Sequence, residues 1–359
     1  MAGPRIGFVI GDDGFWRHRL LSAKQEFHRL KGILLPDVYA LPFLLGSRCT
    51  FIRNGEPIAP SAFDLIFSEL NGSDQQLEYL STLVAATAPP VAVIPGPPEI
   101  ISARLTDHKL RLVRRILLDA PFVLAYSDTI AAFCDGLIGQ ARSRVIPWPF
   151  DYDATRRLAG PATDDRATIR VVLNVPLRFD SFARNYPLVL KAALIDALAA
   201  LPPDARQRFT FSAFVYEDQD AVAFARTGFA DGLAVTLEPR RSFGSFVRFL
   251  GESSAVVNLT STSVLGRVTF LAAALDKPGI FTANSEINQQ LYPGSLVPLL
   301  APSALREALT GLLAGLAAGD VPTRFMPDVA AARRLGDFNH NAIAFARLFA
   351  ALPARRDEP

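Results

Sequence analysis

Short apolar runs alternate with longer amphipathic segments along the first 150 or so residues of the chain. The apolar runs, which end in glycine, proline or polar residues, predict buried strands at 5–11, 63–70, 90–98, 122–127 and 144–153. Apolar residues at helical spacing predict helices between these strands, at 15–31, 73–87, 101–120 and 128–138. This alternation favours a parallel sheet with helices on both faces.

A second series of the same kind follows a polar, turn-rich stretch. It predicts strands at 169–175, 208–216, 233–239, 254–260 and 279–283. The predicted helices lie at 185–201, 218–230, 242–253, 266–278, 303–319 and 339–352. We therefore predict two doubly wound α/β domains facing across a cleft. Their predicted bounds are 1–157 for the first domain, 158–168 for a linker, 169–335 for the second domain, and 336–359 for a C-terminal helix and tail that packs back on the first.

Composition narrows the function classes. The chain has 359 residues, of which 50% are hydrophobic and 20% charged, so it is not a disordered chain. Its net charge of +2 excludes nucleic-acid binding through the whole surface, and any anion site must be local. Cys49 and Cys134 show no metal-ligand spacing, so we expect no metal site. Without a secretory signal or a membrane-spanning apolar stretch, the expected location is the cytoplasm.

Two segments of the second domain have features of an anion site. In "TSTSVLGRVTFLAAALDKP", a strand passes Gly266 and Arg267 into a helix, whose free backbone amides and dipole suit a phosphate. An ordinary strand–turn–helix connection explains this pattern equally well. Arg178 and Arg184 follow the first strand of the domain, where paired guanidinium groups suit a diphosphate. The alternative is a pair of solvated loop arginines.

The order of features over 122–300 resembles the GT-B glycosyltransferases, in particular the glycosyltransferase family 4-like group. The segment 123–133 is similar to a strand–Ser–helix near the end of that group's N-terminal domain, and 144–158 to its interdomain linker. The segment 171–185 resembles the stretch whose basic residues hold the nucleotide diphosphate, and 260–282 the glutamate-bearing helix segment. The resemblance implies two Rossmann-like domains and a nucleoside diphosphate sugar as donor substrate, without a cofactor.

The resemblance also implies roles for particular residues. Arg178 and Arg184 take the roles of the group's diphosphate-binding arginine and lysine, while Gly266, Lys277 and Pro278 match the helix segment. Helix 266–278 begins at the proposed phosphate site.

This sequence departs from the group at the two glutamates of that segment, which Ser263 and Leu271 replace. Leucine cannot accept hydrogen bonds from ribose hydroxyls as the second glutamate does. For the donor sugar and nucleoside, the resemblance points to Ser263, Glu286 and Gln289.

Candidates for acid–base chemistry follow the first strand, where acceptors bind in GT-B enzymes. Asp12, Asp13 and His18 lie in this loop, and a carboxylate there suits a general base acting on an acceptor hydroxyl. The aspartates are equally good helix caps. Glu69, at the end of a predicted strand, is a weaker candidate.

Two further features have alternative explanations. One face of the predicted helix 101–120 is basic and contains Arg104, His108, Arg111 and Arg115. Such a face suits contact with an anionic membrane surface. The alternative is that it is an ordinary solvent-exposed helix face. Near the domain junction, Trp148 suits stacking on a base or sugar, or packing of a hinge.

The sequence therefore predicts a metal-independent glycosyltransferase. Its expected partners are a nucleotide-sugar donor and a carbohydrate or lipid-linked acceptor, without nucleic acid. We expect it in the cytoplasm, with peripheral contact to the inner membrane face through helix 101–120 as a further option. The alternatives are a non-catalytic binding or scaffold protein of GT-B type and a nucleotide-sugar epimerase.

Overall fold

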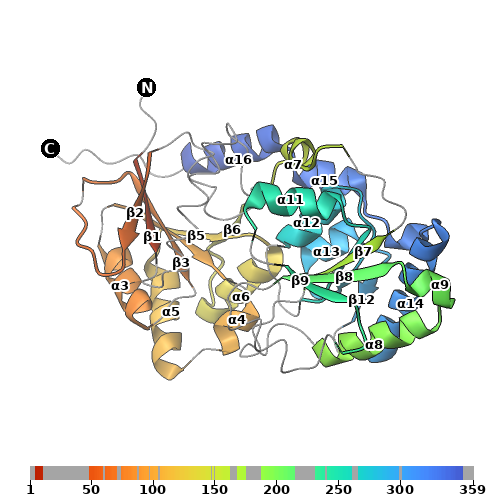
Figure 1. Ribbon diagram of the computed structural model, residues 1–359. Coiled ribbons are helices and arrows are strands. Elements are labelled where there is room, and N and C mark those ends of the chain that lie inside the picture. The colour runs from red at the N-terminus through yellow and green to blue at the C-terminus, as the bar shows by residue number, and fades with distance from the viewer. Residues whose placement is uncertain are drawn as a thin grey trace. The chain divides into compact units, whose positions relative to one another are not determined.

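A computed structural model gives the fold of the chain (Figure 1). It describes residues 5–10, 48–59, 61–70, 74–86, 89–96, 98–103, 106–146, 148, 150–161, 168–174, 187–214, 231–238, 241–260, 266–298 and 301–350. The chain divides into two compact units: unit 1 is Met1–Asp151 with Leu335–Pro359, and unit 2 is Tyr152–Arg334. Each unit is described by itself.

Unit 1 contains a six-stranded sheet in which all neighbouring strands are parallel, in the order β2-β1-β3-β4-β5-β6. The strands are β1 (Arg5–Ile10), β2 (Arg48–Arg53), β3 (Leu65–Leu70), β4 (Val91–Pro95), β5 (Phe122–Ala125) and β6 (Ser143–Val145). Strand β2 was not predicted, because arginines at both of its ends hide the short apolar run. Strand β6 is the short strand predicted at the start of 144–153.

Helices cover both faces of this sheet. They are α3 (Asp74–Ala85), α4 (Pro98–Ala103), α5 (Asp107–Asp119), α6 (Asp128–Ile138) and α16 (Phe338–Ala350). Val9 and Ile66 point to one face and pack in a buried cluster with residues of α3, α5 and α6. Because side chains alternate along a strand, Phe67 points to the other face, where its ring stacks on Phe345 of α16 at 6.3 Å between centroids.

The predicted single helix 101–120 is wrong. Helix α4 ends at Ala103, and Thr106 has the extended conformation of an N-cap, with φ −102° and ψ 167°. Its side-chain oxygen accepts a hydrogen bond from the Lys109 amide at 3.2 Å, which begins α5 as a new helix. Arg104, predicted for the basic face of this helix, lies outside the described residues.

Unit 2 contains a second six-stranded parallel sheet, in the order β12-β11-β10-β7-β8-β9. The strands are β7 (Ile169–Leu173), β8 (Phe209–Phe214), β9 (Val235–Glu238), β10 (Ala255–Asn258), β11 (Gly279–Thr282) and β12 (Leu296–Val297). The described helices are α7 (Tyr152–Ala159), α8 (Pro187–Ala199), α9 (Pro203–Arg206), α11 (Phe243–Gly251), α12 (Arg267–Ala274), α13 (Glu286–Leu291), α14 (Pro302–Ala318), the 3-10 helix η2 (Thr323–Phe325) and α15 (Val329–Leu335).

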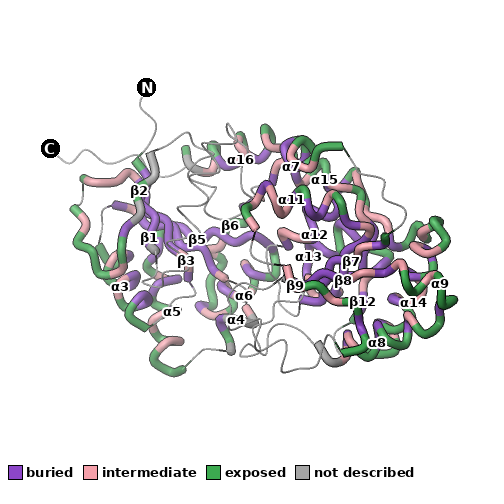
Figure 2. Tube along the Cα trace, viewed as in Figure 1, coloured by how far each residue is buried: buried purple, intermediate pink, exposed green. Residues whose placement is uncertain are grey.

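The core of unit 2 lies on both faces of its sheet. Residues of α8 and α14 pack with Val171 and Val257 in one buried cluster. Phe270 of α12 is fully buried as well. Figure 2 shows the strands of this unit as mostly buried, whereas the outer surfaces of α8 and α14 are exposed. Two Rossmann-like domains, as the sequence predicts, are confirmed.

The chain crosses between the units at places that differ from the predicted linker 158–168. It passes from unit 1 to unit 2 after Asp151 and returns after Arg334. Helix α7 belongs to unit 2, because the Arg156 guanidinium pairs with Asp276 at 2.6 Å and donates to the Ala274 carbonyl at 3.1 Å. Residues 335–359 group with unit 1, where Asn341 Nδ2 donates to the carbonyls of Trp148 and Leu335, each at 2.8 Å.

Candidate functional site

The carboxyl ends of β7 and β10 form the topological switch point of unit 2. Strand β7 lies between β8, its successor in sequence, and β10, so the connections leave in opposite directions. Doubly wound sheets bind ligands at such a point. Asn174 follows β7 and Asn258 ends β10, and the Asn174 Nδ2 donates to the Asn258 Oδ1 at 3.0 Å. Two amide side chains therefore bridge the two strands where a ligand crevice is expected.

Helix α12 begins at this edge with Gly266 as its N-cap. Gly266 has φ 58° and ψ 32°, a left-handed conformation that favours glycine. A Cβ at this position would lie 2.1 Å from the Cγ2 of Ile287. Gly266 has no side chain to cap the helix, and the N-terminal end of a helix dipole favours an anion. Gly266 and Arg267 thus lie where the sequence predicts a phosphate site.

A chain of buried hydrogen bonds holds α12 and α13 to the sheet. The Asn258 Nδ2 donates to the Thr269 hydroxyl at 3.2 Å, and that hydroxyl donates to the Asn288 Oδ1 at 2.7 Å. The Asn288 Nδ2 then donates to the Thr282 carbonyl at 2.9 Å. Asn258, Thr269 and Asn288 are almost completely buried. We call Asn174, Asn258, Thr269, Asn288 and Thr282 the amide network.

The sequence analysis missed the amide network. Its signal was an asparagine at the end of a buried apolar run, which occurs in both "VVLN" and "AVVN" of β7 and β10. Asparagine is uncommon inside strands and favours turns, so each was interpreted only as the end of a strand.

Two of the residues predicted for the donor sugar, Glu286 and Gln289, lie in helix α13, which follows β11. Gln289 is exposed, and its Nε2 donates to the Ala283 carbonyl at 2.7 Å. Glu286 is half-buried in the first turn of α13. Both therefore follow the carboxyl end of β11, two strands from β7 in the same sheet. Asn284 lies in the loop between β11 and α13.

Leu271 and Lys277 both lie in positions that the packing of the fold explains. Leu271, at the position of the missing second glutamate, is fully buried within α12. Lys277 lies at the other edge of the sheet, just before β11, and its carbonyl accepts from the Tyr292 hydroxyl at 2.7 Å. Burial lowers the pKa of Lys277, and nearby Asp276 opposes part of that shift. Lys277, which matches the lysine of the group's helix segment, therefore lies in the turn before β11 and away from the switch point.

Several predicted site residues lie outside the described residues. They are Asp12, Asp13, His18, Arg178, Arg184 and Ser263. Arg178 and Arg184 follow Asn174 in sequence, and Ser263 precedes Gly266. The described residues Asn174 and Gly266 therefore place one end of each of these two unit 2 segments at the switch point of unit 2.

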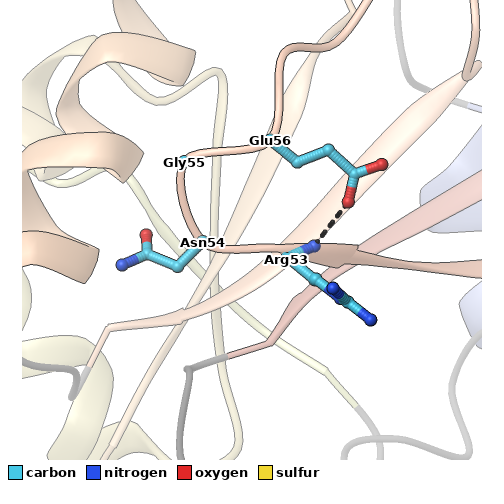
Figure 3. Close-up of a pocket in the computed structure, with 4 residues that line it drawn as sticks. All are labelled: Arg53, Asn54, Gly55 and Glu56. Atoms are coloured by element: carbon cyan, nitrogen blue, oxygen red, sulfur yellow. Dashed lines mark hydrogen bonds between the residues drawn. The ribbon is translucent and has the colours of Figure 1, made fainter.

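Unit 1 has its own switch point between β1 and β3. Glu69, next to the last residue of β3, is half-buried near that edge. At the carboxyl end of β2, which pairs with β1 through Arg53 and Ile10, a turn formed by Arg53, Asn54, Gly55 and Glu56 borders a hollow of about 610 Å³. Figure 3 shows Asn54 and Arg53 extending to opposite sides, while the Glu56 carboxylate accepts from the Arg53 amide at 3.0 Å.

Trp148 is part of an aromatic stack in unit 1. Its ring centroid lies 5.8 Å from that of Tyr126 and 5.5 Å from that of Phe150. Tyr126 and Phe150 are almost completely buried, and Asn341 holds the Trp148 carbonyl. These contacts favour packing over the stacking of a ligand on Trp148.

Two features are absent from the described ranges of the chain. No cluster of three or more histidine, cysteine or acidic side chains with metal-ligand geometry occurs there. No helix in the same ranges is both long and apolar enough to cross a bilayer.

Two doubly wound parallel sheets in one chain are the architecture of the GT-B fold. Solved structures agree with this class. HepE from Anabaena in complex with UDP-glucose has a TM-score of 0.67 and 16% identity, over 97% of this chain and 100% of that one. Sucrose-phosphate synthase from Thermosynechococcus elongatus has a TM-score of 0.63 and 14% identity, over 97% and 99%.

A third solved structure agrees as well. WaaG, a glycosyltransferase involved in lipopolysaccharide biosynthesis, has a TM-score of 0.55 and 12% identity, over 96% of this chain and 98% of that one. No protein-family model and no curated protein sequence matches the chain. The predicted GT-B fold is thus confirmed by structural similarity at low sequence identity.

Proposed function

We propose that this chain is a glycosyltransferase that moves a sugar from a nucleoside diphosphate sugar to a carbohydrate or lipid-linked acceptor. One observation supports this proposal most strongly: the amides of α12 begin at Gly266, at the switch point of unit 2, on a buried amide network. HepE, which shares this fold, is in complex with UDP-glucose in its crystal structure. We assign donor binding to unit 2.

The diphosphate is the leaving group, so negative charge builds on it in the transition state. Groups that stabilise this charge accelerate the reaction. We assign this role to Arg178 and Arg184, with the first amides of α12 and Arg267 assisting. Two guanidinium groups supply the charge that a metal ion supplies elsewhere, so the proposed reaction is metal-independent. Ser263, Glu286 and Gln289 are assigned to the donor sugar and nucleoside.

The acceptor binds unit 1 in this proposal. Asp12, Asp13 and His18 follow β1, and one of them takes the proton from the acceptor hydroxyl as general base. Glu69 at the end of β3 is the second candidate for this role. The turn of Arg53 and Glu56 at the end of β2 presents planar charged groups of the kind that hydrogen-bond carbohydrate hydroxyls.

Donor binding is tested with the nucleoside diphosphates and diphosphate sugars of uridine, guanosine and thymidine. We expect one of them to raise the melting temperature of the full chain, because a ligand that binds only the folded state stabilises it. Arg178→Ala should weaken its binding about tenfold through the loss of a charge-assisted contact. Arg306→Ala is the control, because Arg306 pairs with Asp196 on the outer helices at 3.1 Å. Equal binding by wild type and Arg178→Ala contradicts the assigned role.

The buried Leu271 supports a second candidate function, a non-catalytic binding protein. A leucine at the position of the family's ribose-binding glutamate removes one interaction expected of an active enzyme. Binding of a nucleotide without release of diphosphate in the presence of acceptors supports this candidate. Conversion of the sugar without any acceptor supports an epimerase, the third candidate.

Membrane contact through α5 is part of the proposal that the protein works in the cytoplasm at the inner membrane face. His108 and Lys109 of α5 pair with Glu78 and Asp74 of α3, so part of its charge is neutralised within unit 1. Arg111 and Arg114 are exposed and form no ion pair within the described part of the chain.

We expect the protein to sediment with vesicles containing anionic lipid, but not with neutral vesicles, and to be released by salt. The double variant Arg111→Gln with Arg114→Gln should lose this sedimentation. Arg306→Gln serves as a control for the loss of surface charge. Equal sedimentation with anionic and neutral vesicles, or with none, contradicts membrane contact.

A further inference from the structure

The amide network of unit 2 has a fixed direction. It starts at the backbone carbonyl of Thr282, which can only accept a hydrogen bond. The Asn288 Nδ2 must therefore face this carbonyl, at 2.9 Å, and its Oδ1 accepts from the Thr269 hydroxyl at 2.7 Å. The single hydrogen of that hydroxyl is thereby used, so the Asn258 side chain must turn its Nδ2 toward the Thr269 oxygen, at 3.2 Å.

The same direction continues to Asn174 at the end of β7. Because the Asn258 Nδ2 faces Thr269, the Asn258 Oδ1 faces Asn174, which must offer an N–H to it and does so at 3.0 Å. The Oδ1 of Asn174 is therefore turned away from the network. Asn174 is half-buried, and its Oδ1 has no hydrogen-bond partner among the described residues and is open to solvent. A buried backbone carbonyl thus determines that an acceptor oxygen is presented at the switch point.

The position of Asn174 along the sheet edge indicates which part of the donor it meets. Glu286 and Gln289, assigned to the donor sugar, follow β11, and α12, assigned to the diphosphate, follows β10. Strands β11, β10 and β7 are consecutive in the sheet. In a nucleoside diphosphate sugar, the ribose is joined to the diphosphate on the side opposite to the transferred sugar. A donor that lies along this edge therefore brings its ribose to β7 and Asn174.

The chemistry of the presented atom fits the ribose and not the diphosphate. An amide oxygen has two lone pairs and only accepts, so it suits hydroxyl groups, which donate. The oxygens of a diphosphate are acceptors with negative charge, and the Asn174 Oδ1 would repel them. The opposite orientation of the amide would present N–H groups instead, and the network excludes it.

We infer that the Asn174 Oδ1 accepts hydrogen bonds from the ribose hydroxyls of the donor, and that the amide network holds it in this orientation. The inference rests on the proposed function, and it adds a residue that selects ribonucleotides to those assigned above. Because the acceptor is held in place before the donor binds, little further ordering is needed on binding.

The first experiment compares a ribonucleoside diphosphate with its 2′-deoxy and 3′-deoxy analogues, each titrated against the full chain. For whichever of uridine and guanosine diphosphate the wild type binds more tightly, loss of one or the other hydroxyl should weaken binding about tenfold. Asn174→Ala should bind all three ligands with affinities within about twofold of one another. Each ratio compares ligands on the same folded protein, so a loss of stability in the variant does not produce this result.

The second experiment tests the fixed direction of the network at Thr269. Thr269→Val removes the partner of the Asn258 Nδ2, so the Asn258 amide is free to turn over and no longer sets the orientation of Asn174. We expect the preference for the ribonucleotide to fall to about threefold. Thr269→Ser keeps the hydroxyl and should keep the wild-type preference. An undiminished preference in Thr269→Val would show that the network does not orient Asn174 and would overturn the inference.

The remaining outcomes separate this inference from the proposed function. If the wild type binds the deoxy analogues as tightly as the ribonucleotide, the inference fails and donor binding stands. If Asn174→Ala keeps the wild-type preference, with or without an equal loss of affinity for all three ligands, Asn174 does not contact the ribose. If the wild type binds no nucleoside diphosphate at all, the proposed function itself fails, which is a distinct result.

Discussion

Replacing Gly266 with alanine is expected to remove donor binding and to destabilise unit 2. The left-handed backbone costs a residue with a Cβ about 1–2 kcal/mol, and overpacking of a buried site adds about 1–3 kcal/mol. The new Cβ would lie 2.1 Å from the Ile287 Cγ2, which is itself buried. Either α12 or α13 must therefore move. A displacement of about 1 Å at a phosphate site is enough to lower activity about a hundredfold.

A second glycine of unit 2 provides the matched control. Gly319 ends α14 in a left-handed conformation with φ 72°, and no atom lies within 4 Å of a Cβ built there. Gly319→Ala therefore has the backbone cost without the steric contact, and we expect it to lose about 1 kcal/mol with normal donor binding. Urea unfolding and nucleotide titration of both variants measure the difference. Wild-type donor binding by Gly266→Ala would show that α12 does not hold the donor.

Replacing Thr269 with valine is expected to lower the free energy of unfolding by about 4 kcal/mol. The two side chains have nearly the same shape, but valine cannot bond to the Asn258 Nδ2 or the Asn288 Oδ1, which are both buried. Each unpaired buried group costs about 1–3 kcal/mol. Because a domain is stabilised by only about 5–15 kcal/mol, this loss is a large share of the total.

Thr269→Ser is the control for this change, because it keeps the hydroxyl and loses only a methyl group. We expect it to lose about 1 kcal/mol, measured by urea unfolding of the full chain with circular dichroism. If valine and serine at this position give the same midpoint, the hydroxyl contributes nothing and the amide network does not support α12.

The strand–helix pattern predicts most of the fold because buried parallel strands are continuous apolar runs. The runs at 169–175, 254–260 and 279–283 correspond to β7, β10 and β11. Elements whose burial depends on the rest of the fold escaped prediction. Strand β12 has two residues, and α7 has an apolar side that only its contacts with unit 2 explain.

Only the part of the candidate site that has a local sequence signal could be predicted. Gly266 stands out in sequence because glycine before a helix is a local signal, and the structure gives it the expected position. The amide network has no local signal, because hydrogen bonds between residues up to 84 positions apart, such as Asn174 and Asn258, depend on the pairing of the strands.

The return of the chain to unit 1 through α16 determines the order in which the protein is completed during synthesis. All of unit 2 is synthesised before residue 335, whereas one face of the unit 1 sheet lacks Phe345, the ring that stacks on Phe67, until after unit 2 has been made. Domains generally fold as units while the chain is made, and exposed apolar surface favours aggregation. Unit 1 begins first but is completed only after unit 2, so its sheet keeps an exposed apolar face while unit 2 is synthesised.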